Sequence, residues 1–375
     1  MSFVMNKPLL MIPGPMDSPD EVLRRCGMPV FPHYEGDWAP FYHQLVEKTK
    51  YVFGTSGRVY IPNGSGTVAV NMMLASLCTP DDNVLIINNG HFGAYAEKNC
   101  KSLGIPYTFV HGEHGTVVDY DKVRDEMKRT RHQFIYVTHN ESSTAMVNPL
   151  PPLGEIAREF DALLLSDSIS AIGGVVVDMD ASGADVVAGA SQKCLELPPG
   201  LAPVAVSDRA WDYMLAMKNR RVPYILDFMA WEQAWIDMHT WHPQPVTGST
   251  NMLYALDWVV DNIIEEGMEN RQERFRTAGK RLKDGFSALG FTPAADPLYA
   301  SPVVSEIITP NDIPSDDFRE YCIKKHNVMI GYGRRKNNTD HYVSFRIAHF
   351  GLAAENERID LMISIAVEFL RDRKV

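Results

Sequence analysis

Lys193 is the residue whose surroundings most suggest covalent chemistry. It lies in the small and apolar segment 186–194, where a lysine loses hydration and its pKa falls toward neutrality. A neutral lysine amine is a nucleophile that forms a Schiff base with a carbonyl compound. The alternative is a solvated loop lysine, because most lysines lie at the surface.

Asp167 forms a functional pair with this lysine. It ends the apolar, strand-like run 163–167. A carboxylate at the end of a neighbouring strand can keep the ring nitrogen of pyridoxal phosphate (PLP) protonated. Together the two residues predict a PLP enzyme in which Lys193 and Asp167 are catalytic. The alternative for Asp167 is a helix N-cap, a position that aspartate also favours.

Three further segments carry groups suited to binding this cofactor. The segment 64–67 (Gly-Ser-Gly-Thr) follows a strand and opens a helix, so its backbone N–H groups and the hydroxyls of Ser65 and Thr67 can hold a phosphate. The ring of Phe92 can stack on a planar cofactor, and Ser142 can donate to its phenolic oxygen. Each motif alone is equally typical of a turn, a helix cap or core packing. All of them, however, follow the ends of predicted strands.

Arg346 is a charge inside the apolar strand-like run 343–347, so it needs a partner. Its planar guanidinium can clamp a substrate carboxylate with two hydrogen bonds. An internal ion pair with an aspartate or glutamate is the alternative. The basic run 331–336 is more typical of a solvated loop than of an anion site, and no spacing of histidines and cysteines indicates a metal.

The apolar pattern predicts the elements that position these groups. Between about residues 50 and 210, short Val/Ile/Leu runs alternate with amphipathic stretches, which is typical of a mainly parallel, doubly wound α/β sheet covered by helices. In such a sheet, ligands bind beyond the carboxyl ends of the strands. The expected strands are 59–61, 84–88, 107–110, 134–139, 163–167, 175–177, 186–188 and 204–207. The expected helices are 67–77, 94–103, 120–130 and 153–160.

The C-terminal part has a different pattern. Residues 252–289 predict one or two long helices, and the residues from about 290 onward predict a separate small α+β domain. Its expected elements are strands 303–308, 328–330 and 342–347 and a helix at 356–371. We therefore expect an N-terminal arm at 1–20, a large domain at 21–260 and a small domain at 261–375.

Composition narrows the classes of partner. The net charge of −11 repels polyanions, which argues against a nucleic-acid partner. No apolar run approaches the roughly 20 residues that span a bilayer, which argues against a membrane protein. Five cysteines, an odd number without a CxxC motif, favour reduced thiols in a cytoplasmic protein.

The order and spacing of these motifs resemble the class V, fold-type I PLP-dependent aminotransferases. The chain is most similar to the alanine–glyoxylate and serine–pyruvate aminotransferases, with 2-aminoethylphosphonate–pyruvate transaminases as relatives. The resemblance covers almost the whole chain. Its motifs are 11–15, 64–67, 138–144, 166–168, 191–193, 198–200 and 345–351.

The resemblance implies a role for each matching residue. Lys193 would form the Schiff base and then move the proton between the substrate α-carbon and the cofactor, while Asp167 would pair with the pyridinium nitrogen. Arg346 would bind the substrate carboxylate, and Gly14 would bring backbone close to the substrate. The remaining cofactor contacts would come from Phe92 on the ring, Ser142 at the phenolic oxygen, and Ser65, Gly66, Thr67 and Gln192 at the phosphate.

Two segments depart from the family pattern. Relatives form homodimers in which a hydroxyl-bearing residue before a proline reaches the partner subunit's phosphate, but here Pro243 occupies the matching position. Thr240 is our candidate for this contact, with His242 and Thr247 as alternatives. The segment 32–38 also differs, and we expect its Tyr34 to touch the substrate side chain, which leaves room for an unusual substrate.

The sequence therefore predicts a homodimeric, cytoplasmic aminotransferase. By a ping-pong mechanism it would move an amino group from alanine or serine to glyoxylate or pyruvate. Transamination of 2-aminoethylphosphonate or a similar amine, a PLP-dependent lyase reaction and a non-enzymatic binding role remain alternatives. A desulfurase is disfavoured because Cys322 falls in a predicted helix rather than on a mobile loop.

Overall fold

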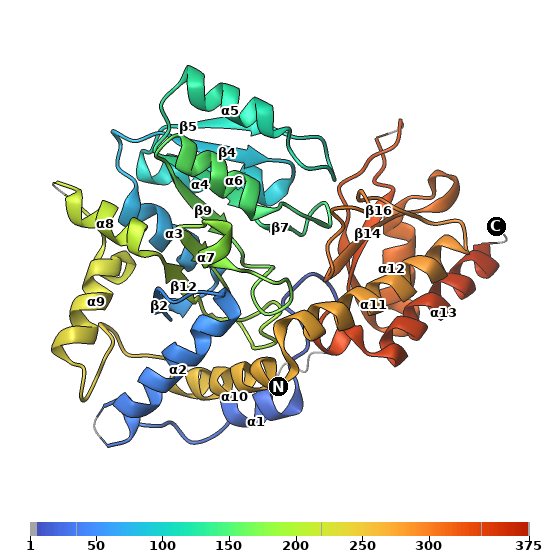
Figure 1. The fold of residues 1–375 in the computed structure, drawn as a ribbon. Helices are drawn as coiled ribbons and strands as arrows, with labels where there is room; N and C mark the ends of the chain where they lie inside the picture. The colour runs from blue at the N-terminus through green and yellow to red at the C-terminus, as the bar shows by residue number, and fades with distance from the viewer. Residues whose placement is uncertain (1–5, 35, 219, 339, 374–375) are drawn as a thin grey trace.

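The central element of the protein is a seven-stranded sheet (Figure 1). The computed structural model describes residues 6–34, 36–218, 220–338 and 340–373. Five strands of this sheet pair in parallel, and only β12 runs against its neighbours. The strand order is β2 (Arg58–Tyr60), β12 (Val204–Val206), β10 (Val186–Ala188), β9 (Leu163–Asp167), β6 (Phe134–Thr138), β4 (Val84–Asn88) and β5 (Tyr107–His111). The predicted mainly parallel sheet is confirmed.

Helices cover both faces of this sheet, because its strands are apolar on both sides. Leu163 and Leu165 pack into one core, and Leu164 between them packs into the other. The first core also contains residues of α3 (Gly66–Leu77), α4 (His91–Leu103), α8 (Asp208–Ala216) and α9 (Phe228–Asp237). The second contains residues of α2 (Trp38–Phe53), α5 (Tyr120–Arg129), α6 (Leu150–Glu159) and α7 (Met179–Ser182).

One predicted strand was wrong. Residues 175–177 do not pair with a neighbouring strand, although Val175 and Val177 are buried. The N–H of Val176 instead donates to Oε1 of Gln272 on helix α11 (Met268–Ser287) at 2.8 Å. The apolar run therefore reflects packing of a turn against helices, which periodicity alone does not distinguish from a short strand.

A second, five-stranded sheet lies at the C-terminal end of the molecule (Figure 1). Its first strand comes from the N-terminal segment and pairs in parallel with β15. The order is β1 (Leu9–Met11), β15 (Val328–Tyr332), β16 (Ser344–Ala348), β14 (Val304–Ile308) and β13 (Thr292–Pro293). Helices α11, α12 (Ser315–His326) and α13 (Asn356–Arg373) pack against it through buried phenylalanines, among them Phe286, Phe318 and Phe345.

Helix α10 (Thr250–Glu266) leads from the large sheet to α11. Between the two helices Gly267 adopts φ +79°, a left-handed backbone that favours glycine. Helix α1 (Asp20–Cys26) packs on α10. The remaining elements are short: strands β3 (Asn63–Gly64), β7 (Asn140–Glu141), β8 (Met146–Val147) and β11 (Gly200–Leu201), and 3-10 turns at Tyr224–Leu226, Pro310–Asp312 and Gly351–Ala354.

The division into an arm, a large domain and a small domain at residues 20 and 260 stays a prediction. Residues 1–5 and 374–375, which it includes, lie outside the described part of the chain. Within the described residues, no helix combines the length and the apolar character needed to cross a membrane.

Candidate active site

The candidate site is built at one edge of the large sheet. Asp167 at the end of β9 lies in register with Thr138 of β6 on one side and with Ala188 of β10 on the other. The loops that follow these three strands therefore start from a common edge, the position where doubly wound sheets bind ligands. The loop after β10 carries Lys193, and the loop after β6 carries Ser142.

The N-terminal segment of the chain packs against the side chain of Lys193. Its Nζ donates a hydrogen bond to the carbonyl oxygen of Pro13 at 2.6 Å. Gly14 has φ +117°, and a Cβ at this position would lie 2.6 Å from Lys193 Nζ, so only glycine fits. Burial lowers the pKa of Lys193 to about 8. The residue is thus a partly desolvated amine rather than a solvated loop lysine.

Asp167 is buried next to this lysine. Its Oδ2 accepts a hydrogen bond from the Tyr136 hydroxyl at 3.2 Å, and its Oδ1 accepts one from the Ile169 N–H at 3.1 Å. Burial raises the pKa of Asp167 to about 6. A carboxylate in this position gains from a cationic hydrogen-bond donor such as a pyridinium N–H.

The residues predicted to bind phosphate lie at the start of helix α3. Ser65 is its N-cap residue, with φ −87° and ψ 172°, but its side chain makes no capping hydrogen bond. The first-turn N–H groups of Gly66 and Thr67 have no acceptor within the helix. Gly66 also lies against Ile169, because a Cβ there would sit 2.4 Å from Ile169 Cδ1. This helix start therefore adjoins the Asp167 loop.

Two buried polar atoms of the predicted site lack hydrogen-bond partners in the described chain. Ser142 Oγ and Gln192 Oε1 have no hydrogen-bond partner among the described residues. Unsatisfied buried polar atoms are uncommon in folded proteins, so each needs an explanation. The phenolic oxygen of a phosphorylated pyridine supplies an acceptor for the Ser142 hydroxyl. Its phosphate would accept from the NH2 group of Gln192, with the amide turned so that this group and not Oε1 faces the phosphate. The residues present therefore fit PLP.

Sequence reasoning missed Glu141, which fixes the loop beneath Phe92. This carboxylate is fully buried (0 % exposed). Its Oε2 accepts the N–H groups of Phe92 and Gly93 at 2.9 and 3.0 Å, and its Oε1 accepts that of Ser143 at 3.0 Å. Glu141 thereby joins the start of α4 to the Ser142 loop. Two of its three donors, Phe92 and Gly93, come from a distant segment, so sequence spacing carried no signal of this role.

Arg346 lies on β16 close to Ser142. Its Nη1 donates to the Ser142 carbonyl at 2.9 Å, and its Nε donates to the Tyr332 carbonyl at 2.6 Å. Among the described residues no carboxylate forms an ion pair with it, so the internal ion pair considered from sequence is absent there. Burial lowers the pKa of Arg346 to about 10. Together with Pro13 and Gly14 it lines a pocket of about 590 Å³.

Two predicted site residues lie away from this constellation. Tyr34 is half exposed and lines a different pocket, beside Trp38 and Tyr254. Thr240 is exposed in the turn after α9. In the described parts of the chain, neither residue makes a hydrogen bond or ring contact with Lys193 or Arg346. Their roles, like those of the other predicted site residues, stay predictions.

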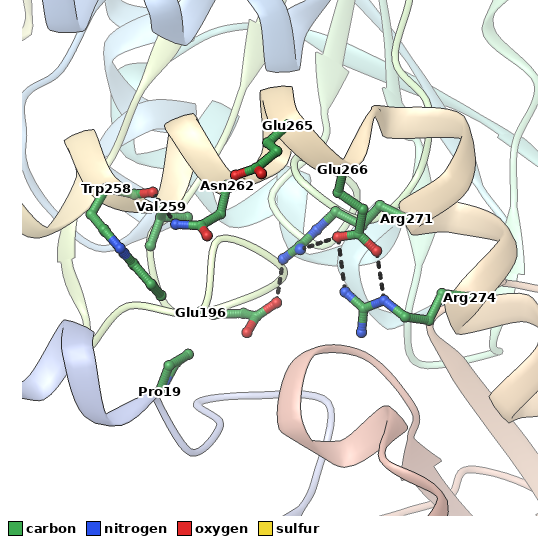
Figure 2. A pocket seen from close by; sticks show the side chains of 9 residues that line it. All are labelled: Pro19, Glu196, Trp258, Val259, Asn262, Glu265, Glu266, Arg271 and Arg274. Carbon is green, nitrogen blue, oxygen red and sulfur yellow. Dashed lines mark hydrogen bonds and ion pairs between the residues drawn. The ribbon is translucent and has the colours of Figure 1, made fainter.

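A buried arginine, which sequence reasoning also missed, holds the loop that carries Lys193. Arg271 on α11 donates to the Gly173 carbonyl at 2.7 Å and to the Cys194 carbonyl at 3.2 Å. It also forms ion pairs with Glu196 and Glu266. Figure 2 shows these carboxylates converging on its guanidinium. Arg271 therefore fixes the backbone on the C-terminal side of Lys193.

Comparisons with known proteins decide the family. The model of the aminotransferase class-V family matches residues 33–358. The chain is a member of this family. It is 32% identical to an uncharacterised aminotransferase from Methanocaldococcus jannaschii, over 94% of this chain and 90% of that protein. It is 29% identical to the (S)-ureidoglycine–glyoxylate transaminase of Bacillus subtilis, over 86% of this chain and 81% of that protein.

The fold of this class-V aminotransferase matches that of solved relatives. The crystal structure of an alanine–glyoxylate aminotransferase from Nostoc superposes with a TM-score of 0.92 at 24% identity, over 99% of this chain and 97% of the other. The protein is accordingly a fold-type I enzyme, and family and fold together imply PLP as its cofactor. The resemblance recognised from the sequence is confirmed.

Proposed function

We propose that this aminotransferase moves the amino group of a small amino acid, alanine or serine, to glyoxylate or pyruvate by a ping-pong mechanism. The carrying observation is the convergence of a lysine with pKa near 8, a buried aspartate and an arginine that forms no ion pair with a carboxylate of the described residues. The glyoxylate-dependent relative supports the choice of acceptor.

The cofactor end of the site supplies the electronic part of the reaction. When bound, PLP provides a carbonyl group for the amine and a protonated ring that withdraws electrons from the substrate α-carbon. Asp167 would stabilise the positive charge on the ring nitrogen, and Phe92 would stack on the ring. Ser65, Gly66, Thr67 and Gln192 would hold the phosphate, and Ser142 would donate to the phenolic oxygen.

Lys193 moves the proton. With a pKa near 8, its Nζ is neutral in a useful fraction of molecules at neutral pH, so it accepts a proton from the substrate α-carbon and returns it. The Pro13 carbonyl and Gly14 confine the amine to the interior and limit its contact with water.

Arg346 anchors the substrate carboxylate. Two main-chain carbonyls fix its orientation, so binding freezes few additional rotamers. Its Nη2 has no partner among the described residues and is available to the substrate. A carboxylate there forms the charge-assisted hydrogen bonds that no carboxylate of the described chain makes with this guanidinium.

We also infer a homodimer in the cytoplasm. Large apolar side chains around α9 are exposed in the single chain, among them Tyr224 (62%), Ile236 (61%) and Trp241 (46%). An exposed apolar surface of this kind marks an interaction site. In such a dimer, Thr240 of each subunit would reach the phosphate site of the other.

A desulfurase reaction receives no support. Cys322 is fully buried in α12, and burial raises the pKa of its thiol to about 12. A thiol of this kind is protonated at neutral pH and out of reach of a substrate.

Isotope transfer tests the proposed reaction. Incubation of the holoenzyme with [15N]alanine and glyoxylate should give pyruvate and [15N]glycine in equal amounts, with parallel lines in double-reciprocal rate plots. Release of free ammonia without labelled glycine would show a lyase instead. Turnover of 2-aminoethylphosphonate but not of alanine or serine would establish the phosphonate alternative.

A further inference from the structure

Arg334 is a second guanidinium beside the proposed carboxylate anchor. It follows β15, and its backbone N–H donates to Glu306 Oε1 at 3.2 Å. Glu306 in turn faces Arg346 directly across strands β14 and β16. The Arg334 side chain is exposed, and its guanidinium forms no hydrogen bond or ion pair with the residues that the structure describes.

Glu306, the carboxylate that links the two arginines, already accepts hydrogen bonds from other groups. Glu306 is buried and accepts hydrogen bonds from the Ser344 hydroxyl at 2.7 Å and from the Arg334 N–H, while its Oε2 lies 2.8 Å from His114 Nε2. Arg335 Nε also lies 3.6 Å from Glu306 Oε2. The charge of Glu306 acts on Arg346 through space, but within the described chain Glu306 makes no hydrogen bond with the guanidinium of Arg334 or of Arg346.

Two neighbouring arginines, in contrast, have partners within the protein. Arg319 pairs with Asp316 at 2.6 Å and lies over the ring of Tyr332. Arg335 donates to the carbonyls of His114 and Ala294 at 3.1 and 3.0 Å and forms an ion pair with Glu306 at 3.6 Å. Arg334 and Arg346 thus differ from these two in having no carboxylate partner in the described chain.

The charges of Arg334 and Arg346 both act on His91 at the start of α4. Burial, and then the positive charges of Arg334 and Arg346, lower the pKa of His91. His91 precedes Phe92 at the start of α4, and its ring lies edge-on to that of Phe92 at 5.3 Å between centroids. Glu306, which accepts the Arg334 N–H and lies opposite Arg346 in the sheet, holds the Arg334 main chain next to the carboxylate anchor.

We propose that Arg334 is a second anion-binding residue of this active site, which binds the distal carboxylate or phosphate of an acidic amino donor while Arg346 binds its α-carboxylate. The inference rests on the proposed function and extends the donors from alanine and serine to amino acids with a second anionic group. A guanidinium binds carboxylate and phosphate oxygens alike through paired hydrogen bonds. A neutral donor leaves Arg334 in water and gains nothing from it.

The first test compares donors in the amino-donating half-reaction of the holoenzyme. KM for aspartate, glutamate, O-phosphoserine and alanine is measured in the wild type, in Arg334→Gln and in Lys336→Gln. We expect Arg334→Gln to raise KM for the best acidic donor about 10-fold or more relative to KM for alanine. Lys336→Gln removes a charge from the same loop, but Lys336 is paired with Asp340 at 2.7 Å, so this control should preserve the ratio.

The identity of the best acidic donor separates the two sources of the second anion. Preference for O-phosphoserine points to a phosphate, and preference for aspartate or glutamate points to a carboxylate. Equal effects of Arg334→Gln on acidic donors and on alanine would overturn the proposal.

A second measurement does not depend on turnover. In calorimetric titrations of the holoenzyme, succinate should bind with a lower Kd than propionate in the wild type, and this advantage should fall about 10-fold or more in Arg334→Gln. If no donor reacts but this difference in Kd persists, the proposed function fails while the anion site stands. If alanine reacts and succinate has no advantage over propionate, the anion site fails alone.

Discussion

At the scale of single residues, burial shifts the pKa values of two charged side chains in the site. It lowers the pKa of Lys193 and raises that of Asp167, so each is less stable in its charged form than it would be in water. Both shifts prepare the site for a cationic ring next to Asp167 and a neutral amine at Lys193. The fold maintains this arrangement with Pro13, Gly14 and Tyr136.

The Lys193 shift predicts a pH dependence in the apo-protein. The neutral amine increases as pH rises through the folded-state pKa of about 8, against 10.5 for an ordinary lysine, so roughly a tenth is neutral at pH 7. Reductive methylation of Lys193, followed by peptide mass spectrometry, should therefore show a rate midpoint near pH 8. A midpoint above pH 10 would show that the amine is solvated.

Glu141 gives a second prediction at this scale. In Glu141→Gln, the amide NH2 must face at least one of the three N–H donors, so an unsatisfied pair should cost about 1–3 kcal/mol of stability. The displaced Phe92 loop should also weaken PLP binding. Thermal unfolding of the apo-protein and a fluorescence titration with PLP measure both effects. The control is Glu159→Gln, which removes an exposed ion pair with Arg124 and should change stability and PLP affinity little. If Glu141→Gln also left stability and PLP affinity unchanged, the proposed role of Glu141 would be wrong.

At the scale of elements, strand ends were the part of the site that sequence could predict. Continuous apolar runs located β6, β9 and β10, and the parallel pairing brought the loops carrying Ser142 and Lys193 to one edge. The run 175–177 misled because burial of a turn and burial of a strand give the same pattern. Long-range contacts were out of reach, because the partners of Arg271 and Glu141 lie in segments far along the chain.

Helix α11 supports the lysine loop through Arg271. We therefore expect substitution of Arg271 to reduce stability much more than substitution of its neighbour Arg274. Arg271→Met should destabilise the protein by about 3–5 kcal/mol because it leaves Glu196 buried without a counter-charge. Arg274→Met, which removes an exposed partner of Glu266, should cost about 1 kcal/mol or less. Urea unfolding measures both.

A double-mutant cycle isolates this contact. Glu196→Gln in the Arg271→Met background should recover part of the lost stability, since the uncompensated charge is removed. Strict additivity of the two changes would contradict the coupling between Arg271 and the lysine loop.

At the scale of the whole molecule, the two residues left outside the constellation point to assembly. Tyr34 and Thr240 make no contact with Lys193 or Arg346 in the described chain, yet the sequence suggested that they serve the site. Their roles stay predictions, and residue spacing within one chain carries no information on their position relative to a neighbouring subunit.

This predicts that Thr240 acts across a subunit interface. The protein should have a solution mass of twice the 42.1 kDa of one chain by light scattering. Thr240→Val should weaken PLP binding about 2- to 10-fold, the loss of one hydrogen bond to a charged phosphate. The neighbouring Thr247→Val serves as the comparison. A monomeric protein, or a Thr240→Val variant with unchanged affinity, would refute the contact.

The central claim is that Lys193 carries PLP for amino transfer, and visible absorbance tests it most directly. The spectrum of the purified holoenzyme should show the band of lysine-linked cofactor. Alanine or serine should convert this band to that of the pyridoxamine form, and glyoxylate or pyruvate should restore it. The band should be missing in Lys193→Ala. Wild-type protein without such a band, even after incubation with PLP, would contradict the account.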